Sequence, residues 1–163
     1  MTDNTKGAAE IGREIRQAFP NVPAPTSVLE MLLPPYQNSI DATEMAAQFV
    51  GRVWHEIPSI ELFRHREMLS TMSAAAYRAL LPAYLLACVD ETPASQRNVG
   101  DMWEYTYASL KAWQDDGDAD GAALAAQRLE LLDERQRDAV RSVLRYIAAR
   151  TARRDVQTLL DEW

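Results

Sequence analysis

Hydrophobic side chains recur at helical spacing along most of the chain. Residues 6–18, 41–57 and 101–113 each place apolar side chains three or four positions apart, which is the period of an amphipathic helix. Proline clusters at residues 20–25 and 34–35 separate the first of these segments. Because proline disfavours helical backbone in the preceding residue, we expect extended connectors there and helices between them.

Two further helices are predicted from start signals and spacing. Ser59 is a candidate cap for a helix that continues to about residue 70, and residues 122–132 return to a helical pattern after a polar loop. Asp41 and Glu44 have the spacing of a capping box, so we expect the helix at residues 41–57 to begin at Asp41.

The most apolar segment, residues 73–90, is expected to form the centre of the core. Apolar side chains occupy nearly every face of residues 79–89, as in an element surrounded by others. Ser73 is a candidate N-cap. Pro82 predicts a break or kink near Leu81, because proline lacks the amide proton of the helical ladder and clashes with the preceding turn.

The last thirty residues have the clearest helical pattern. Asp133 is followed three positions later by Gln136, and neither glycine nor proline occurs from there to Trp163. We expect one long helix, with a break near Thr151 as the alternative. Residues 134–163 hold seven Arg and five acidic residues, a net charge of +2, so the rest of the chain carries −9.

These patterns predict a single all-α domain over residues 1–163, an irregular bundle of six to eight helices with a long C-terminal helix. In an alternative, residues 1–26 form a loosely packed N-terminal arm. A chain of 163 residues is long enough to bury a core without disulfides or metals. Its single cysteine, Cys88, lies in an apolar run and is expected to be a buried, inert thiol.

The chain is acidic, with 17 Lys and Arg against 24 Asp and Glu and a net charge of −7. Phosphate contacts need clustered basic residues, so we expect no nucleic-acid partner. The first residues lack the apolar region of a signal peptide, and residues 79–89 are too short for a membrane helix of about 20 residues. We therefore expect a cytoplasmic protein without a membrane partner.

Acidic side chains are densest at residues 115–120. Asp116, Asp118 and Asp120 occupy positions 1, 3 and 5 of a calcium-loop pattern, and Gly121 follows at position 6. Position 12 is Gln127, whose neutral amide is a weaker ligand than the usual glutamate. We favour a solvated acidic turn. A calcium- or metal-dependent regulator is the alternative, and calcium would then raise the melting temperature.

His55 and His65 are the only histidines, and Glu61 lies four residues before His65 on the same predicted helix face. The chain lacks the close pairs of His or Cys that hold zinc. It also lacks a nucleophile elbow, a P-loop and a dinucleotide-binding motif. We therefore expect no enzyme and no cofactor, with a small enzyme that uses His55 or His65 as the alternative.

Residues 72–87 read MSAAAYRALLPAYLLA; they follow Trp54 and precede LDERQRDAV at residues 132–140. With its YRALLPAYL motif, this combination resembles an uncharacterised bacterial family of helical proteins over about residues 41–148. The family motif has Pro-Glu where this chain has Ala74 and Ala75. The resemblance implies a helical fold and assigns no catalytic role.

Small, acidic bacterial proteins of the cytoplasm are often immunity proteins. This analogy predicts a non-enzymatic protein-interaction module, an inhibitor that occludes a basic toxin or enzyme, because an acidic surface attracts a basic partner and speeds their encounter. The sequence leaves open the oligomeric state and whether Arg78 and Tyr84 belong to the core or to a pocket. The candidate contacts lie in or beside two acidic loops: Glu91, Asp101, Trp113, Asp115, Asp116, Asp118 and Asp120.

Overall fold

The computed structural model describes residues 6–90, 99–111 and 119–163, without the side chains of residues 99–101, 119–122, 125 and 162. Within these ranges the all-α fold class is confirmed, with ten α-helices and two 3₁₀ helices. The elements are α1 (Ala8–Ala18), α2 (Val28–Met31), η1 (Pro34–Tyr36), α3 (Ile40–Ala47), η2 (Trp54–Glu56), α4 (Ser59–Arg64), α5 (Met68–Thr71), α6 (Ala74–Val89), α8 (Val99–Leu110), α9 (Ala119–Glu130), α10 (Glu134–Thr151) and α11 (Arg154–Glu162).

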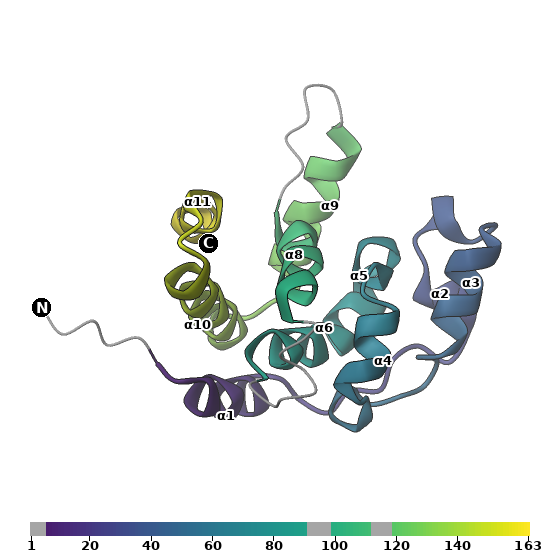
Figure 1. Ribbon diagram of the computed structural model, residues 1–163. Helices are drawn as coiled ribbons and strands as arrows, with labels where there is room; N and C mark the ends of the chain where they lie inside the picture. The colour runs from purple at the N-terminus through teal and green to yellow at the C-terminus, as the bar shows by residue number, and fades with distance from the viewer. Residues whose placement is uncertain (1–5, 91–98, 112–118) are drawn as a thin grey trace, which may run out of the picture.

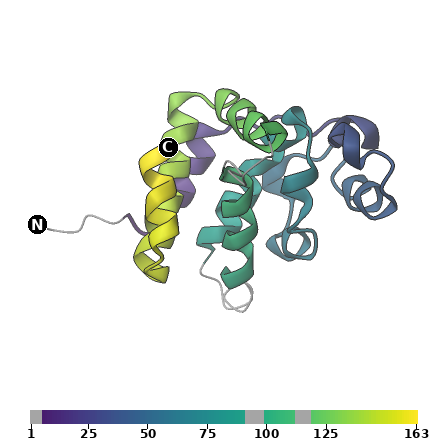
Figure 2. The ribbon, with the colours of Figure 1, turned by 90° about the horizontal axis from the view of Figure 1, so that it is seen from above.

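The described residues hold more α-helices than the six to eight expected, because the predicted helices at residues 59–70 and 134–163 each divide into two and α2 adds a short helix that was not predicted. The two views in Figures 1 and 2 show α10 and α11 at one end of the molecule, α2 and α3 at the other, and α6 between them. No helix of the described ranges is long and apolar enough to cross a membrane.

Helix α6 is the centre of the core, as predicted. It packs against α1, α2, α4, α8, α9 and α10, and most of its side chains are buried. Ser73 caps it by accepting a hydrogen bond from the amide of Ala76. The predicted break at Leu81 is wrong, since one helix runs through Pro82. The neighbouring helices surround this segment, and their packing outweighs the one helical hydrogen bond that proline removes.

The N-terminal helix α1 packs against the core. Helix α1 lies against both α6 and α10. Its apolar stripe buries Ile11 and Ile15, and Phe19 is buried directly after the helix. The segment that follows is held by a backbone hydrogen bond from the amide of Ala24 to the carbonyl of Arg52 (2.8 Å).

Residues 41–57 do not form the single helix that their spacing predicts. Helix α3 ends at Ala47, and Gly51 has a φ of 68°, which glycine adopts at no steric cost. The cap is Ser39 rather than Asp41, because the Ser39 hydroxyl accepts from the amide of Ala42 (3.3 Å). The apolar stripe was nevertheless placed correctly in the core, since Phe49 is buried.

The C-terminal segment begins at the predicted capping box and then divides. The amide of Gln136 donates to Asp133 Oδ1 (2.9 Å), and Gln136 Oε1 accepts from the amide of Asp133 (3.1 Å). Helix α10 ends at Thr151, and Ala152 is left-handed with a φ of 51°. The alternative with a break near Thr151 is therefore confirmed, and the unbroken helix is wrong.

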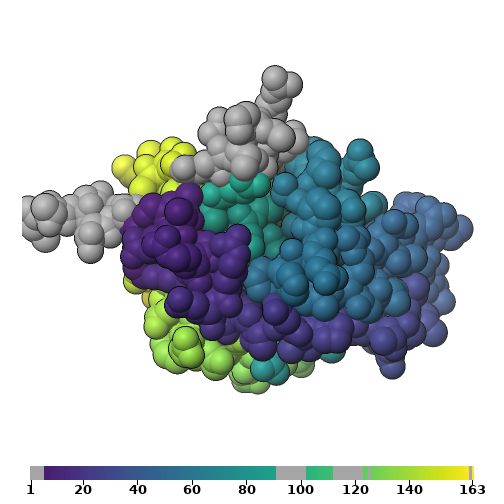
Figure 3. All heavy atoms as spheres, turned by 90° about the horizontal axis from the view of Figure 1, so that it is seen from below, coloured from purple at the N-terminus to yellow at the C-terminus, as the bar shows by residue number. Residues whose placement is uncertain are grey.

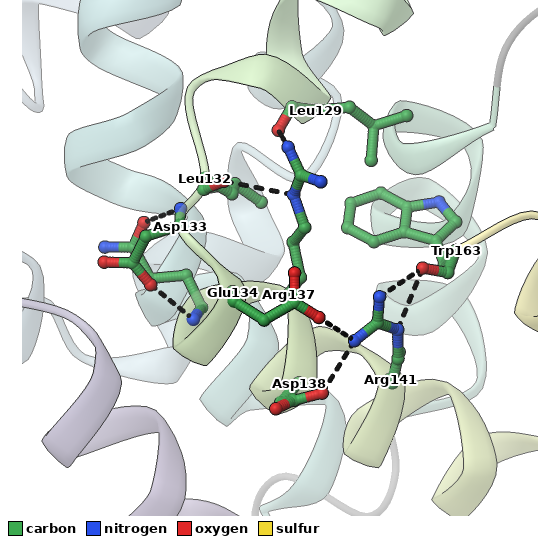
Figure 4. Close-up of polar contacts among 9 residues, drawn as sticks. Leu129, Leu132, Asp133, Glu134, Arg137, Asp138, Arg141 and Trp163 are labelled. Carbon is green, nitrogen blue, oxygen red and sulfur yellow. Dashed lines mark hydrogen bonds and ion pairs between the residues drawn. The ribbon is translucent and has the colours of Figure 1, made fainter.

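Helix α11 folds back along α10. Arg141 of α10 donates from Nε (2.8 Å) and Nη2 (2.6 Å) to the carbonyl oxygen of Trp163, as Figure 4 shows. The same guanidinium bridges Glu134 (2.9 Å) and Asp138 (2.6 Å). Trp163 is partly buried against the core, so this terminal aromatic side chain is docked.

Candidate functional site

The sequence-predicted partner contacts cannot be placed from the structure. Five of them fall in residues 91–98 or 112–118, and the side chains of the other two are also outside the described part of the chain. The contacts concerned are Glu91, Asp101, Trp113, Asp115, Asp116, Asp118 and Asp120. They therefore remain predictions.

The calcium-loop pattern is described only from Ala119 onward, where the backbone already belongs to α9. Gly121 and Gln127 thus lie on a helix, whereas a calcium loop needs a sharp turn at the glycine. Asp116 and Asp118 lie outside the described residues. Among the side chains that the structure describes, no group of three or more His, Cys, Asp and Glu could hold a metal ion.

The two histidines pack against separate aromatic rings. His55 lies in η2 with its ring edge-on to Trp54 (5.7 Å between centroids), and its Nε2 is 4.0 Å from Glu56 Oε1. His65 lies edge-on to Phe49 (5.6 Å). Each imidazole thus packs on an aromatic neighbour, and the structure gives them no shared acid–base geometry.

The predicted pair between Glu61 and His65 is not formed. Helix α4 ends at Arg64, so His65 falls outside the helix and loses the register that would bring it above Glu61. Glu61 forms an ion pair with Arg52 instead. Helical spacing brings two side chains together only while the helix continues between them.

Cys88 is a buried thiol, as predicted, and is 1% exposed. Its Sγ donates a hydrogen bond to Thr106 Oγ1 (3.4 Å). Burial raises the pKa of Cys88 to about 12, and the hydrogen bond with Thr106 opposes this only in part.

Native protein should therefore resist alkylation of Cys88 by iodoacetamide at pH 8. About one thiol in ten thousand would be the reactive thiolate at that pH, and the side chain is covered. Mass spectrometry would follow the label over time, with urea-unfolded protein as the control that labels fully. Equal labelling rates for the folded and unfolded forms would contradict this expectation.

Both side chains that the sequence left open are now placed. Arg78 is exposed on α6 and needs no buried carboxylate partner. Tyr84 belongs to the core, where its hydroxyl donates to the carbonyl of His65 (3.0 Å) and burial raises its pKa.

The arginine that is buried is Arg128 of α9, at 7% exposure. It donates to the carbonyls of Leu69 (2.9 Å), Ser70 (3.3 Å) and Ser109 (3.4 Å), and it stacks 4.5 Å from the centre of the Tyr77 ring. Burial lowers its pKa. These contacts are with the backbone and one core ring, so Arg128 holds helices together.

A sequence signal for Arg128 existed. It lies four residues after Leu124 and four before Leu132, on the apolar stripe of its helix. Charged side chains are almost never fully buried without a partner, so this spacing alone does not predict that Arg128 is buried.

An exposed apolar surface lies at the end of the molecule formed by α2, η1 and α3, the blue-violet segment of Figures 1 and 3. Among the described residues, four of the five exposed large hydrophobic side chains belong to residues 22–40. We name this region the α2–α3 surface and define it by apolar Leu29, Tyr36 and Ile40 together with acidic Glu30, Asp41 and Glu44.

The backbone beneath the α2–α3 surface is held by the segment before α6. Ser73 donates its hydroxyl to the carbonyl of Glu30 (2.6 Å) and its amide to the carbonyl of Met31 (2.9 Å). The amide of Leu33 donates to the carbonyl of Thr71 (2.9 Å). Gln37 Nε2 donates to the carbonyl of Leu29 (3.0 Å), which links η1 to α2.

Comparison with known proteins identifies a family but no activity. The model of one protein family, described as a family of unknown function (DUF6714), matches residues 7–162. No curated protein and no solved structure matches the chain.

Proposed function

The chain belongs to the DUF6714 family, a family of unknown function, and we propose from its surface that it is a non-enzymatic module that binds a basic protein partner. In its most concrete form the protein is an immunity protein that occludes a toxin. The observation that carries the proposal is the α2–α3 surface, where exposed apolar side chains lie among acidic ones.

The exposed apolar side chains of the α2–α3 surface favour a protein partner that would bury them. Ile40 is 74% exposed at the first residue of α3, and Leu29 is 59% exposed on α2. Burying one such side chain in an interface contributes about 1.5–3 kcal/mol. Exposed apolar side chains gathered in one region are typical of protein–protein contact sites.

The acidic charges of the same surface indicate that the partner is basic. Residues 17–51 contain three acidic residues and no Lys or Arg. Glu30, Asp41 and Glu44 are exposed, and none forms an ion pair with a described residue. A complementary surface would place Lys or Arg around an apolar centre, and such complementarity raises the rate of encounter and the specificity.

The fixed backbone favours binding without rearrangement. Because Ser73 and Gln37 already hold the carbonyls of Glu30 and Leu29, less conformational freedom is lost when a partner docks. The predicted acidic contacts at residues 115–120 carry the same sign of charge and belong to the proposal as further contacts.

Ile40→Ser is expected to weaken partner binding by about ten-fold or more. The partners to test are the purified products of the genes on either side of its own, with affinity measured by calorimetry at two NaCl concentrations. The matched control is Ile60→Ser, an exposed isoleucine in the first turn of α4 and outside the α2–α3 surface. Raising the salt should also weaken binding, because screening acts on exposed charges.

Three outcomes would contradict the proposal. The first is that neither gene product binds. The second is that Ile60→Ser weakens binding as much as Ile40→Ser does. The third is that light scattering shows a dimer of this chain that Ile40→Ser dissociates, because a second copy would then be the occupant of the α2–α3 surface. Circular dichroism of both variants checks that each remains folded.

A further inference from the structure

A groove of about 690 Å³ lies between helices α10 and α11. These helices stand at the end of the molecule opposite α2 and α3 (Figure 1). One wall is a face of α10 with Arg145 and the alanines at positions 148, 149 and 152, and the other is a face of α11 with Arg154 and Leu160. The small alanines leave the space between the helices open. Pockets of 300–1,000 Å³ are typical of small-molecule sites.

The groove is basic although the protein is acidic. Its charged lining residues are Lys6, Arg145, Arg153 and Arg154, against the single carboxylate of Asp161. The whole chain has a net charge of −7. A concave surface lined by one sign of charge concentrates ions of the opposite sign.

Two of these guanidinium groups are not neutralised by described residues. Arg145 and Arg154 are exposed, and neither forms an ion pair in the described part of the chain. By contrast, the nearby Arg153 pairs with Asp155 (2.5 Å) and Glu104 (3.2 Å). The fold thus supplies carboxylates to one of the three groove arginines, Arg153, and leaves the other two available to a ligand.

A third cation reaches the same wall from the N-terminal side. Lys6 donates from Nζ to the hydroxyl of Ser142 (3.3 Å), a buried side chain that lines the groove, and also pairs with Glu14. Lys6, Ser142 and Arg145 also line a second hollow of about 430 Å³, together with Arg135 and the carboxylates of Glu14 and Asp138. The basic groove therefore borders a second hollow of mixed charge toward α1, and its own volume of about 690 Å³ has room for more than an inorganic ion.

We propose that this groove binds a small phosphate monoester. Guanidinium groups match phosphate oxygens in a two-pronged geometry, and two un-neutralised arginines balance a dianion better than a singly charged carboxylate. The organic part of the ligand packs on Leu160 and the alanine face of α10. The site is independent of the α2–α3 surface and of the partner proposed above.

Phenyl phosphate is the probe, titrated by calorimetry into the full-length chain at constant ionic strength. We expect it to bind more tightly than inorganic phosphate, because its ring reaches the apolar wall. Arg145→Gln and Arg154→Gln should each raise the dissociation constant about ten-fold or more, because each removes a charge-assisted hydrogen bond. Arg78→Gln, another exposed arginine without a described ion pair, is the matched control and should change nothing.

The proposal is overturned if Arg78→Gln weakens binding as much as the groove variants do, which would indicate general charge attraction. It is also overturned if inorganic phosphate binds as tightly as phenyl phosphate, or if neither binds. Arg145 and Arg154 are both exposed, so the variants should keep the wild-type melting temperature. Ile40→Ser should leave phosphate affinity unchanged, which keeps this test separate from that of the partner.

Discussion

Replacing Trp54 with alanine is expected to lower the free energy of unfolding by about 3–5 kcal/mol. Trp54 is 2% exposed and lies in η2, which packs directly against α6. Its Nε1 donates to the carbonyl of Pro20 (3.2 Å), so the ring also holds the connector that follows α1. The substitution would open a large cavity beside α6 and leave that carbonyl without its donor.

Urea unfolding followed by circular dichroism would measure the loss. Trp54→Phe should cost less, about 1–2 kcal/mol, because it keeps most of the apolar area and removes the donor. The matched control is Trp163→Phe at a partly buried tryptophan for which we expect a change below about 1 kcal/mol. If Trp54→Phe and Trp163→Phe proved equally destabilising, the central role of Trp54 would be refuted.

Replacing Arg128 with alanine is expected to cost about 3 kcal/mol. The side chain joins α9 to the carbonyls of Leu69 and Ser70 around α5 and of Ser109 in the last turn of α8. Alanine would leave these carbonyls without their donor and expose the face of the Tyr77 ring to a cavity. The helix dipole of α8 also favours the Arg128 cation, because the guanidinium lies near the C-terminal end of that helix.

Two further variants separate charge from volume at Arg128. Arg128→Met should lose less stability than Arg128→Ala, because it fills the space and removes the desolvation cost of a buried cation. Arg128→Lys should lose an intermediate amount, since one ammonium lacks the planar fork that reaches several carbonyls. Arg78→Ala, at an exposed position on α6, should stay within about 0.5 kcal/mol of wild type. If Arg128→Ala lowered the free energy of unfolding no more than Arg78→Ala does, the stabilising role of Arg128 would be refuted.

The helical class, the central segment and several caps could be predicted because they depend on neighbours within one or two turns. Asp133 with Gln136 and Ser73 cap their helices as expected. The same reasoning failed at residues 41–57, where apolar residues keep helical spacing across the left-handed turn at Gly51. Periodicity indicates which side chains become buried. Here Phe49 and Ile57 are buried although their backbone is not part of an α-helix.

The position of the candidate surfaces could not be predicted from neighbouring residues in the sequence. The sequence directed attention to residues 115–120, where acidic density is highest, yet the exposed apolar side chains lie at residues 22–40. Leu29 and Ile40 look like ordinary core residues in a helical pattern. Their exposure follows from which faces of α2 and α3 the remaining helices leave uncovered.

The sequence by itself determined an all-α fold and a core built on α6, because backbone hydrogen bonds and helical periodicity involve residues only a few positions apart. Only the tertiary structure decided that Arg128 rather than Arg78 is buried, and that Arg145 and Arg154 face a common groove. These placements depend on contacts between helices distant in sequence. Packing such helices together sets which charges lose water and which remain available to a partner or ligand.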